Sequence, residues 1–149
     1  LSDGERASLS GTAAVSVNRN TGYISGKKIY VCDSDSSAVT RTVNGVIYVT
    51  SEFAAEALGK RAVYEADRNV FKLKDDELFY TVLGTAEARL GGKFKPITNA
   101  VTVIDGRIYV PVTLFSEVFG YELKTDGNVA VFGERVTDSA FEAAKGLAF

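Results

Sequence analysis

The chain contains one stretch of sequence twice. Residues 44–59 read NGVIYVTSEFAAEALG, and residues 105–120 read DGRIYVPVTLFSEVFG. Laid over each other, the two stretches agree at six positions, which are two glycines, an Ile-Tyr-Val triplet and one glutamate. An ordinary composition gives about one such match by chance in a window this short. The chain is therefore predicted to fold as two copies of one unit.

Each stretch begins as a β-hairpin. Asn44-Gly45 and Asp105-Gly106 readily adopt the positive φ angles of a two-residue type I′ turn, and β-favouring residues flank both pairs. After the first turn, Ile47 and Val49 alternate with Tyr48, which predicts aliphatic side chains toward the core and the tyrosine on the other, outward side. The second copy repeats this pattern with Ile108, Val110 and Tyr109.

The apolar period then changes to that of a short helix. Pro111 stands where the first turn of a helix tolerates proline, and Gly59 and Gly120 stand where a left-handed C-terminal cap favours glycine. The predicted apolar stripes are Phe53, Ala54, Ala57 and Leu58 in the first copy and Leu114, Phe115, Val118 and Phe119 in the second.

The similarity extends beyond these stretches. A further hairpin is predicted after each helix, and in the second copy it turns at Asp126-Gly127. Upstream, residues 22–31 align with residues 88–97 as two strands joined by a tight turn. The first copy carries about five extra residues, which we place in the polar segment CDSDSSAVTR as a loop.

These observations divide the chain into an N-terminal tail (1–11), copy one (12–75), copy two (76–135) and a C-terminal helix or linker to a further domain (136–149). The acidic run at 75–77 is predicted as a charged turn between the copies, which form one intertwined domain because no linker separates them. The predicted fold class is α+β, with antiparallel sheets, short helices packed on one face, two internal repeats and a C-terminal helix.

The last strand of the second copy carries a specific prediction. It is apolar on both faces because it has Val129 and Val131 where the first copy has Val70 and Lys72. Strands that are apolar on both faces are usually covered on both faces. We therefore expect the C-terminal helix, or a domain that follows it, to pack on the two valines. Its predicted cap is a Ser139/Glu142 capping box, and its apolar stripe is Phe141, Ala144 and Ala148.

Composition excludes several classes of function. The net charge is −2 and Lys and Arg are scattered, so nucleic acid is not an expected partner. No segment approaches the length of a transmembrane span. The chain has no His and one Cys, which removes His-based catalysis, an imidazole metal site and an internal disulfide. No cofactor is expected. Because Met is absent, we expect a mature form or a piece of a larger protein.

Some residues still resemble sites. Asp33, Asp35 and Ser37 have the spacing of the first calcium ligands of an EF-hand, but Ala38 stands at the glycine position and Asn44 at the glutamate position. The alternative is a solvated polar loop.

Two glutamates and the cysteine are candidate reactive groups. Glu56 and Glu117 are symmetric candidates for a pair of catalytic carboxylates, but they lie on the polar side of the predicted helices. A solvated face is the favoured interpretation. For Cys32, which follows an apolar strand, a buried and inert thiol is favoured over a nucleophile.

The two quoted stretches, each followed by a hairpin, resemble the NGRTYVPLRFVAEALG pattern of the copper amine oxidase N-terminal domain-like family, also called stalk domains. The resemblance covers nearly the whole chain, and the second copy is closer because the first has Thr50 in place of the proline. Both copies lack the arginine that commonly follows VPL. The resemblance implies a non-catalytic module of secreted and cell-envelope bacterial proteins. Copper is not implied, because copper amine oxidases hold it with histidines in a separate domain.

Three functions follow from this sequence. The favoured one is a non-catalytic scaffold or attachment module, extracellular or in a bacterial cell envelope, with a neighbouring domain or a cell-envelope polysaccharide as its partner. The second is a carbohydrate-binding module that uses Tyr48 and Tyr109 as equivalent outward rings. The third is an enzyme with two catalytic carboxylates, which requires a pocket with facing Asp or Glu side chains.

Overall fold

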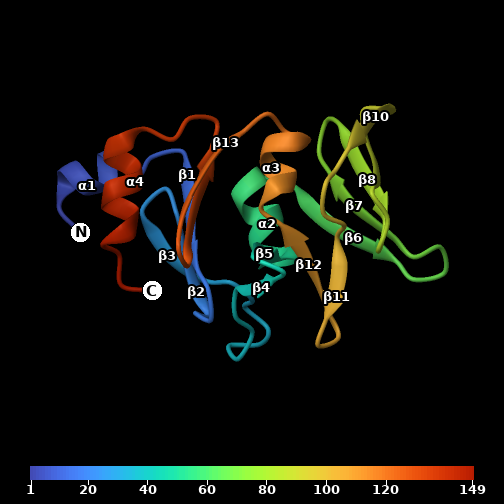
Figure 1. The fold of residues 1–149 in the computed structure, drawn as a ribbon, viewed down its shortest axis with the longest axis horizontal. Coiled ribbons are helices and arrows are strands. Elements are labelled where there is room, and N and C mark those ends of the chain that lie inside the picture. Colours follow the sequence, from blue (N-terminus) through green and yellow to red (C-terminus); the bar gives the residue numbers. More distant parts are fainter.

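The computed structural model describes all 149 residues and contains three antiparallel sheets and four short helices (Figure 1). Strands make up 42% of the residues and helices 18%, which confirms the predicted α+β class. The order of five strands, one helix and two strands occurs twice, first in β1–β7 with α2 and then in β8–β14 with α3.

The terminal sheet, with strand order β13-β14-β1-β2-β3, joins strands from both ends of the chain. Strand β1 pairs antiparallel with β14, so that Ala14 lies opposite Val131. The last two strands of the chain therefore complete a sheet that the first three begin. Its strands are β1 (Thr12–Ser16), β2 (Thr21–Ile24), β3 (Lys27–Tyr30), β13 (Glu122–Asp126) and β14 (Val129–Gly133).

The distal sheet, with strand order β10-β9-β8-β7-β6, lies at the opposite end of the molecule (Figure 1). The hairpin between β7 and β8 crosses the acidic run at 75–77, as predicted. This sheet also combines strands from both halves of the chain. Its strands are β6 (Arg61–Glu65), β7 (Val70–Lys74), β8 (Leu78–Val82), β9 (Glu87–Leu90) and β10 (Lys93–Pro96).

The central sheet and two helices fill the space between the other sheets (Figure 1). Its strands, in the order β11-β12-β5-β4, are β4 (Arg41–Val43), β5 (Val46–Thr50), β11 (Thr102–Ile104) and β12 (Arg107–Pro111). The helices are α2 (Ser51–Leu58) and α3 (Thr113–Glu117). One core of 22 buried residues joins the central sheet, both helices and the inner faces of the other two sheets.

The sequence predicted most of the turns. Both residues of Asn44-Gly45 and of Asp105-Gly106 have positive φ, as a type I′ turn requires. The turn between β13 and β14 is different, because Asp126 pairs with Val129 and only Gly127 has positive φ. The predicted turn at Asp126-Gly127 is therefore wrong by one residue. Residues 32–40 of the predicted loop contain no helix or strand, and its last residue, Arg41, is the first residue of β4.

The predicted glycine cap is correct for α2 and wrong for α3. Gly59 is the left-handed C-cap of α2, with φ of 65°. Helix α3 ends earlier, with Val118 as its C-cap, so Gly120, whose φ is 68°, lies two residues beyond the cap. Pro111 is the last residue of β12 and not a residue of the helix, since α3 begins at Thr113. The prediction for Pro111 is therefore wrong. The residue ends strand β12 and lies opposite Tyr48 of β5.

Helices α1 (Asp3–Ser8) and α4 (Asp138–Lys145) lie together at the end where both termini lie (Figure 1). Helix α4 packs on β14, and Val131 is fully buried in a cluster with Val129 at its edge, which confirms the predicted cover. The predicted Ser139/Glu142 cap is wrong because the side chain of Thr137 accepts the hydrogen bond from the Ala140 N–H. Helix α1 was not predicted. No helix in the structure has the length and apolar character that a membrane crossing requires.

Candidate functional site

The two tyrosines proposed as ligand-binding rings lie on adjacent strands of the central sheet. Tyr109 pairs with Thr50, two residues from Tyr48, so the structure brings both rings to one face. Only 6% of Tyr48 and 3% of Tyr109 is exposed, and burial raises the pKa of both hydroxyls. The predicted outward position is therefore wrong, and neither ring offers a face on which a sugar can stack.

The loop at 32–40 explains the burial of Tyr109. The Tyr109 hydroxyl donates a hydrogen bond of 2.7 Å to the backbone carbonyl of Val39, which lies in this loop. The aliphatic residues of the same strands face the opposite side, toward the main core, as predicted. Tyr48 and Tyr109 are thus buried on one face of the central sheet and the aliphatic residues on the other, and the extra residues of the first half fold back over Tyr109.

The most concentrated group of polar side chains lies where this loop meets the other half of the chain. The Cys32 thiol donates to a Glu52 carboxylate oxygen at 2.8 Å, and the Arg107 guanidinium contacts the Cys32 sulfur at 3.0 Å and the same glutamate oxygen at 3.3 Å. Its other nitrogen donates to Asp35 at 2.8 Å. We call these four residues the Arg107 network; it connects the loop, the start of α2 and strand β12.

The electrostatics of this network favour charged groups that stay paired with each other. Burial raises the pKa of the Glu52 carboxyl, but hydrogen bonds from Cys32 and Ser51 and the charge of Arg107 outweigh it, so the pKa lies below its ordinary value of 4.5. Cys32 is 1% exposed, as predicted for a buried thiol. Although a thiol beside a carboxylate has the chemistry of a nucleophile and base, no substrate atom can approach a sulfur buried to this degree.

The structure does not bring the three calcium candidates together. One Asp35 oxygen accepts hydrogen bonds from the backbone N–H and the hydroxyl of Ser37, and the other accepts from Arg107. Asp33 lines a separate hollow beside β3. The carboxylate of Asp35 is therefore occupied by donors and a cation, and this arrangement is that of a polar turn.

Glu56 and Glu117, the equivalent glutamates of the two halves, are also not brought together. Glu56 is exposed on α2 and lines the hollow beside β3, of about 370 Å³, with Glu52 and Asp33. Glu117 is exposed on α3 and accepts hydrogen bonds from the backbone and the hydroxyl of Thr98, which fixes the loop before β11. The two carboxylates do not face each other across a shared cleft, as a pair of glycosidase carboxylates must.

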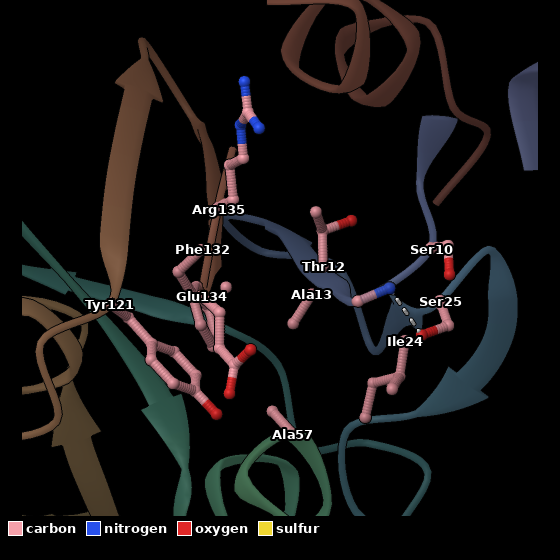
Figure 2. Close-up of a pocket in the computed structure, with 12 residues that line it drawn as sticks. Ser10, Thr12, Ala13, Ile24, Ser25, Ala57, Tyr121, Phe132, Glu134 and Arg135 are labelled. Atoms are coloured by element: carbon pink, nitrogen blue, oxygen red, sulfur yellow. Dashed lines mark hydrogen bonds between the residues drawn. The ribbon is translucent and has the colours of Figure 1, made fainter. Parts of the chain in front are cut away.

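A hollow of about 360 Å³ lies between the terminal sheet and the end of α2 (Figure 2). Tyr121 forms one wall, and burial together with the charge of Glu134 raises its pKa. Glu134 and Arg135 are exposed on its rim, and neither belongs to an ion pair. Its volume is at the low end for small-molecule sites, and its lining lacks a nucleophile with an adjacent base.

Comparison with known families decides the classification. The profile of the copper amine oxidase N-terminal domain matches residues 23–132. The chain belongs to this family. As an N-terminal domain of copper amine oxidase type, it is of the non-catalytic kind, and the family resemblance expected from the two repeated stretches is confirmed. No curated protein matches the chain.

The residues of this N-terminal domain do not fit a copper site. Copper(II) in proteins is typically held by imidazole nitrogens, and the chain has no His. No group of three or more Cys, Asp or Glu side chains is placed to hold a metal ion. The single Cys is engaged with Glu52 and Arg107. The family name therefore carries no metal chemistry over to this chain.

Sequence reasoning missed the Arg107 network and the hollow beside Tyr121. The network joins side chains from positions 32, 35, 52 and 107, and no local pattern connects them. The only available signal was that Arg107 stands where the first copy has Val46. The hollow forms because β1 and β14, from opposite ends of the chain, lie side by side over α2.

Proposed function

We propose that the chain is a non-catalytic scaffold or attachment module, located outside the cell or in a bacterial cell envelope, that holds a neighbouring domain of a larger protein. The observation that carries this proposal is the position of the two termini. Helices α1 and α4 contact each other at one end of the molecule, and the distal sheet lies at the other end (Figure 1). Segments attached to either terminus would leave from the same end, so the module would project from its parent chain.

The packing supports a scaffold role. Each of the outer sheets combines strands from both halves, and the conspicuous polar groups of the centre are bound to each other in the Arg107 network. Pulling on either terminus therefore acts on strands that pair with the opposite half of the chain. Such interlocked antiparallel pairing suits a module that must stay folded while it carries another domain.

The carbohydrate-binding alternative loses its two tyrosines, since both rings are buried. It keeps support only if another exposed aromatic surface exists. The enzyme alternative has little in its favour. Asp33, Glu52 and Glu56 line one hollow beside β3, but Glu52 is bound to Arg107 and Cys32, and Glu117, the equivalent of Glu56, lies elsewhere and binds Thr98.

The proposal is tested by locating the parent protein. The gene that encodes this chain should be expressed with its natural flanking sequence and with an epitope tag inserted at Asn44-Gly45, an exposed turn. We expect the tagged protein in the medium or the envelope fraction, and we expect antibody to label intact cells. Recovery only in the cytoplasmic fraction would overturn the proposal.

A further inference from the structure

One row of side chains crosses all five strands of the distal sheet on its outer face. Cross-strand pairing joins Val63 to Lys72, Lys72 to Tyr80, Tyr80 to Arg89, and Arg89 to Phe94. Directly paired residues present their side chains on the same face of a sheet. Because adjacent strands lie about 4.8 Å apart, Tyr80 and Phe94 stand about 10 Å apart with Arg89 between them.

No helix covers this face. Helices α1, α3 and α4 pack elsewhere, and α2 contacts the distal sheet at β6 only. Phe94 is 53% exposed, and Leu78 and Val82 are exposed on the same face of β8. The Arg89 guanidinium carbon lies 6.0 Å from the centre of the Phe94 ring, which is within cation–π range. The outer face is therefore open over β8, β9 and β10, where it presents aromatic, apolar and cationic groups, whereas Val70 and Lys72 on the same face of β7 are largely buried.

The charge of this face is opposite to that of the chain. Four cations project from it, Arg61, Lys72, Lys74 and Arg89, against two carboxylates, Glu65 and Glu87. Lys72 is paired with Glu65 at 2.6 Å, whereas the other three cations belong to no ion pair. The chain as a whole has a net charge of −2. A cationic face on an acidic protein attracts anions to one place.

We propose that the outer face of the distal sheet binds a polyuronate, a polysaccharide whose repeating sugar carries a carboxylate. The Tyr80 and Phe94 rings supply apolar faces for the C–H side of sugar rings, at a separation close to the length of a disaccharide. The Arg89 guanidinium lies against the Phe94 ring with one nitrogen 3.4 Å from the Gly92 carbonyl, and its remaining N–H groups can bind a carboxylate. This inference rests on the proposed location outside the cell, where such polymers occur.

Other polymers fit the row less well. A neutral glucan gives the three unpaired cations no partner, and a glycerol phosphate polymer has no sugar ring to stack on the aromatic groups. A single-stranded nucleic acid also combines rings with one anionic group per unit, but the proposed location outside the cell disfavours it, and the test below includes it as a competitor. A polyuronate matches both the rings and the modest excess of positive charge.

Calorimetric titration of the full chain with sodium polygalacturonate tests the proposal. We expect saturable binding that weakens as NaCl is raised, because exposed ion pairs are screened by salt. Phe94→Ala and Arg89→Gln should each weaken binding by about ten-fold. Phe94→Tyr keeps the ring and should bind as the wild type does. Thermal unfolding by circular dichroism should show that all variants are folded.

Tyr30→Ala is the matched control. Tyr30 is 52% exposed on β3, the corresponding edge strand of the terminal sheet, and two lysines precede it in the same strand. Its replacement should leave binding unchanged. Absence of saturable binding, equal loss in Tyr30→Ala, or tighter binding of cellohexaose, glycerol phosphate polymer or a dT20 oligonucleotide would each overturn the proposal. If binding is absent while the parent protein still locates to the envelope, only this inference fails.

Discussion

The terminal and distal sheets are built from corresponding strands. A helix covers the outer face of the terminal sheet, and no helix covers the outer face of the distal sheet. On the distal sheet the row is Val63, Lys72, Tyr80, Arg89 and Phe94. The row at the corresponding positions of the terminal sheet is Lys124, Val131, Ala14, Tyr23 and Lys28. The middle three residues of the terminal row are buried in a cluster with Leu9 and α4, whereas no helix covers the distal row.

This difference shows how one strand arrangement serves two purposes. In the terminal sheet, Val131 and Ala14 are short and apolar, which allows α4 to pack closely on β14. Tyr23 also donates a hydrogen bond to the Ala148 carbonyl at 2.9 Å and stacks edge-on against Phe149. In the distal sheet, the corresponding positions are long, polar or aromatic. The terminal face stabilises the fold, whereas the distal face is open over β8 to β10, which is where we place the proposed ligand.

The largest expected effect comes from exchanging one residue between the faces. Val131→Lys places the lysine of the distal row beneath α4, at a position with no exposure. We expect a loss of about 3–5 kcal/mol in the free energy of unfolding, because the ammonium group is buried without a partner. Urea denaturation followed by circular dichroism measures it.

The reverse exchange, Lys72→Val, is the control. It removes the partly buried Lys72–Glu65 ion pair and should change the free energy of unfolding by no more than about 1 kcal/mol. Equal losses in the two variants would show that the distal face is packed as closely as the terminal face, and the comparison would fail.

The Val129 and Val131 prediction succeeded because a period-2 pattern reports which face of a strand is apolar, and an apolar face needs a cover. The hairpins and the left-handed glycines were predicted for a similar reason, since their conformation depends on two or three adjacent residues. The Ser2 and Glu5 capping box of α1 was also readable in the sequence, since each side chain caps the other residue's backbone N–H.

The candidate site was less predictable because its properties depend on distant segments. Tyr48 and Tyr109 were correctly placed away from the aliphatic face, but their exposure depended on where the loop at 32–40 folds. The Arg107 network likewise requires three segments that are separated along the chain. Local patterns define which face a residue occupies, and long-range packing decides whether that face is covered.

A smaller effect is expected at the centre of the molecule, where the two halves also differ. Arg107→Val introduces the residue that the other half has at this position, Val46. Glu52 and Asp35 would each lose a cationic partner, and both carboxylates are partly exposed, so we expect a loss of about 1–2 kcal/mol in the free energy of unfolding. Differential scanning calorimetry should show the lowered melting temperature.

Arg41→Val serves as the comparison for this variant. Arg41 pairs with Asp105, whose side chain is largely exposed, and exposed pairs contribute at most about 1 kcal/mol. If Arg107→Val were no more destabilising than Arg41→Val, the network would be a surface feature and not a clamp between the halves.

The smallest expected effect is a change in the free energy of unfolding at low pH. The pKa of Glu52 is lower in the folded chain than its ordinary value of 4.5, so its ionised form stabilises the fold above that pH, and this stabilisation is lost as the pH falls through the lowered pKa. In Glu52→Gln the side chain is neutral at every pH. The difference in unfolding free energy between wild type and Glu52→Gln should therefore shrink as the pH is lowered from 6 to 3 in urea titrations.

Glu56→Gln, which removes an exposed carboxylate of the same helix, controls for net charge. A difference that stays constant across this range would mean that the Arg107 network does not hold Glu52 in its ionised form, and that the asymmetry between the halves is one of packing alone.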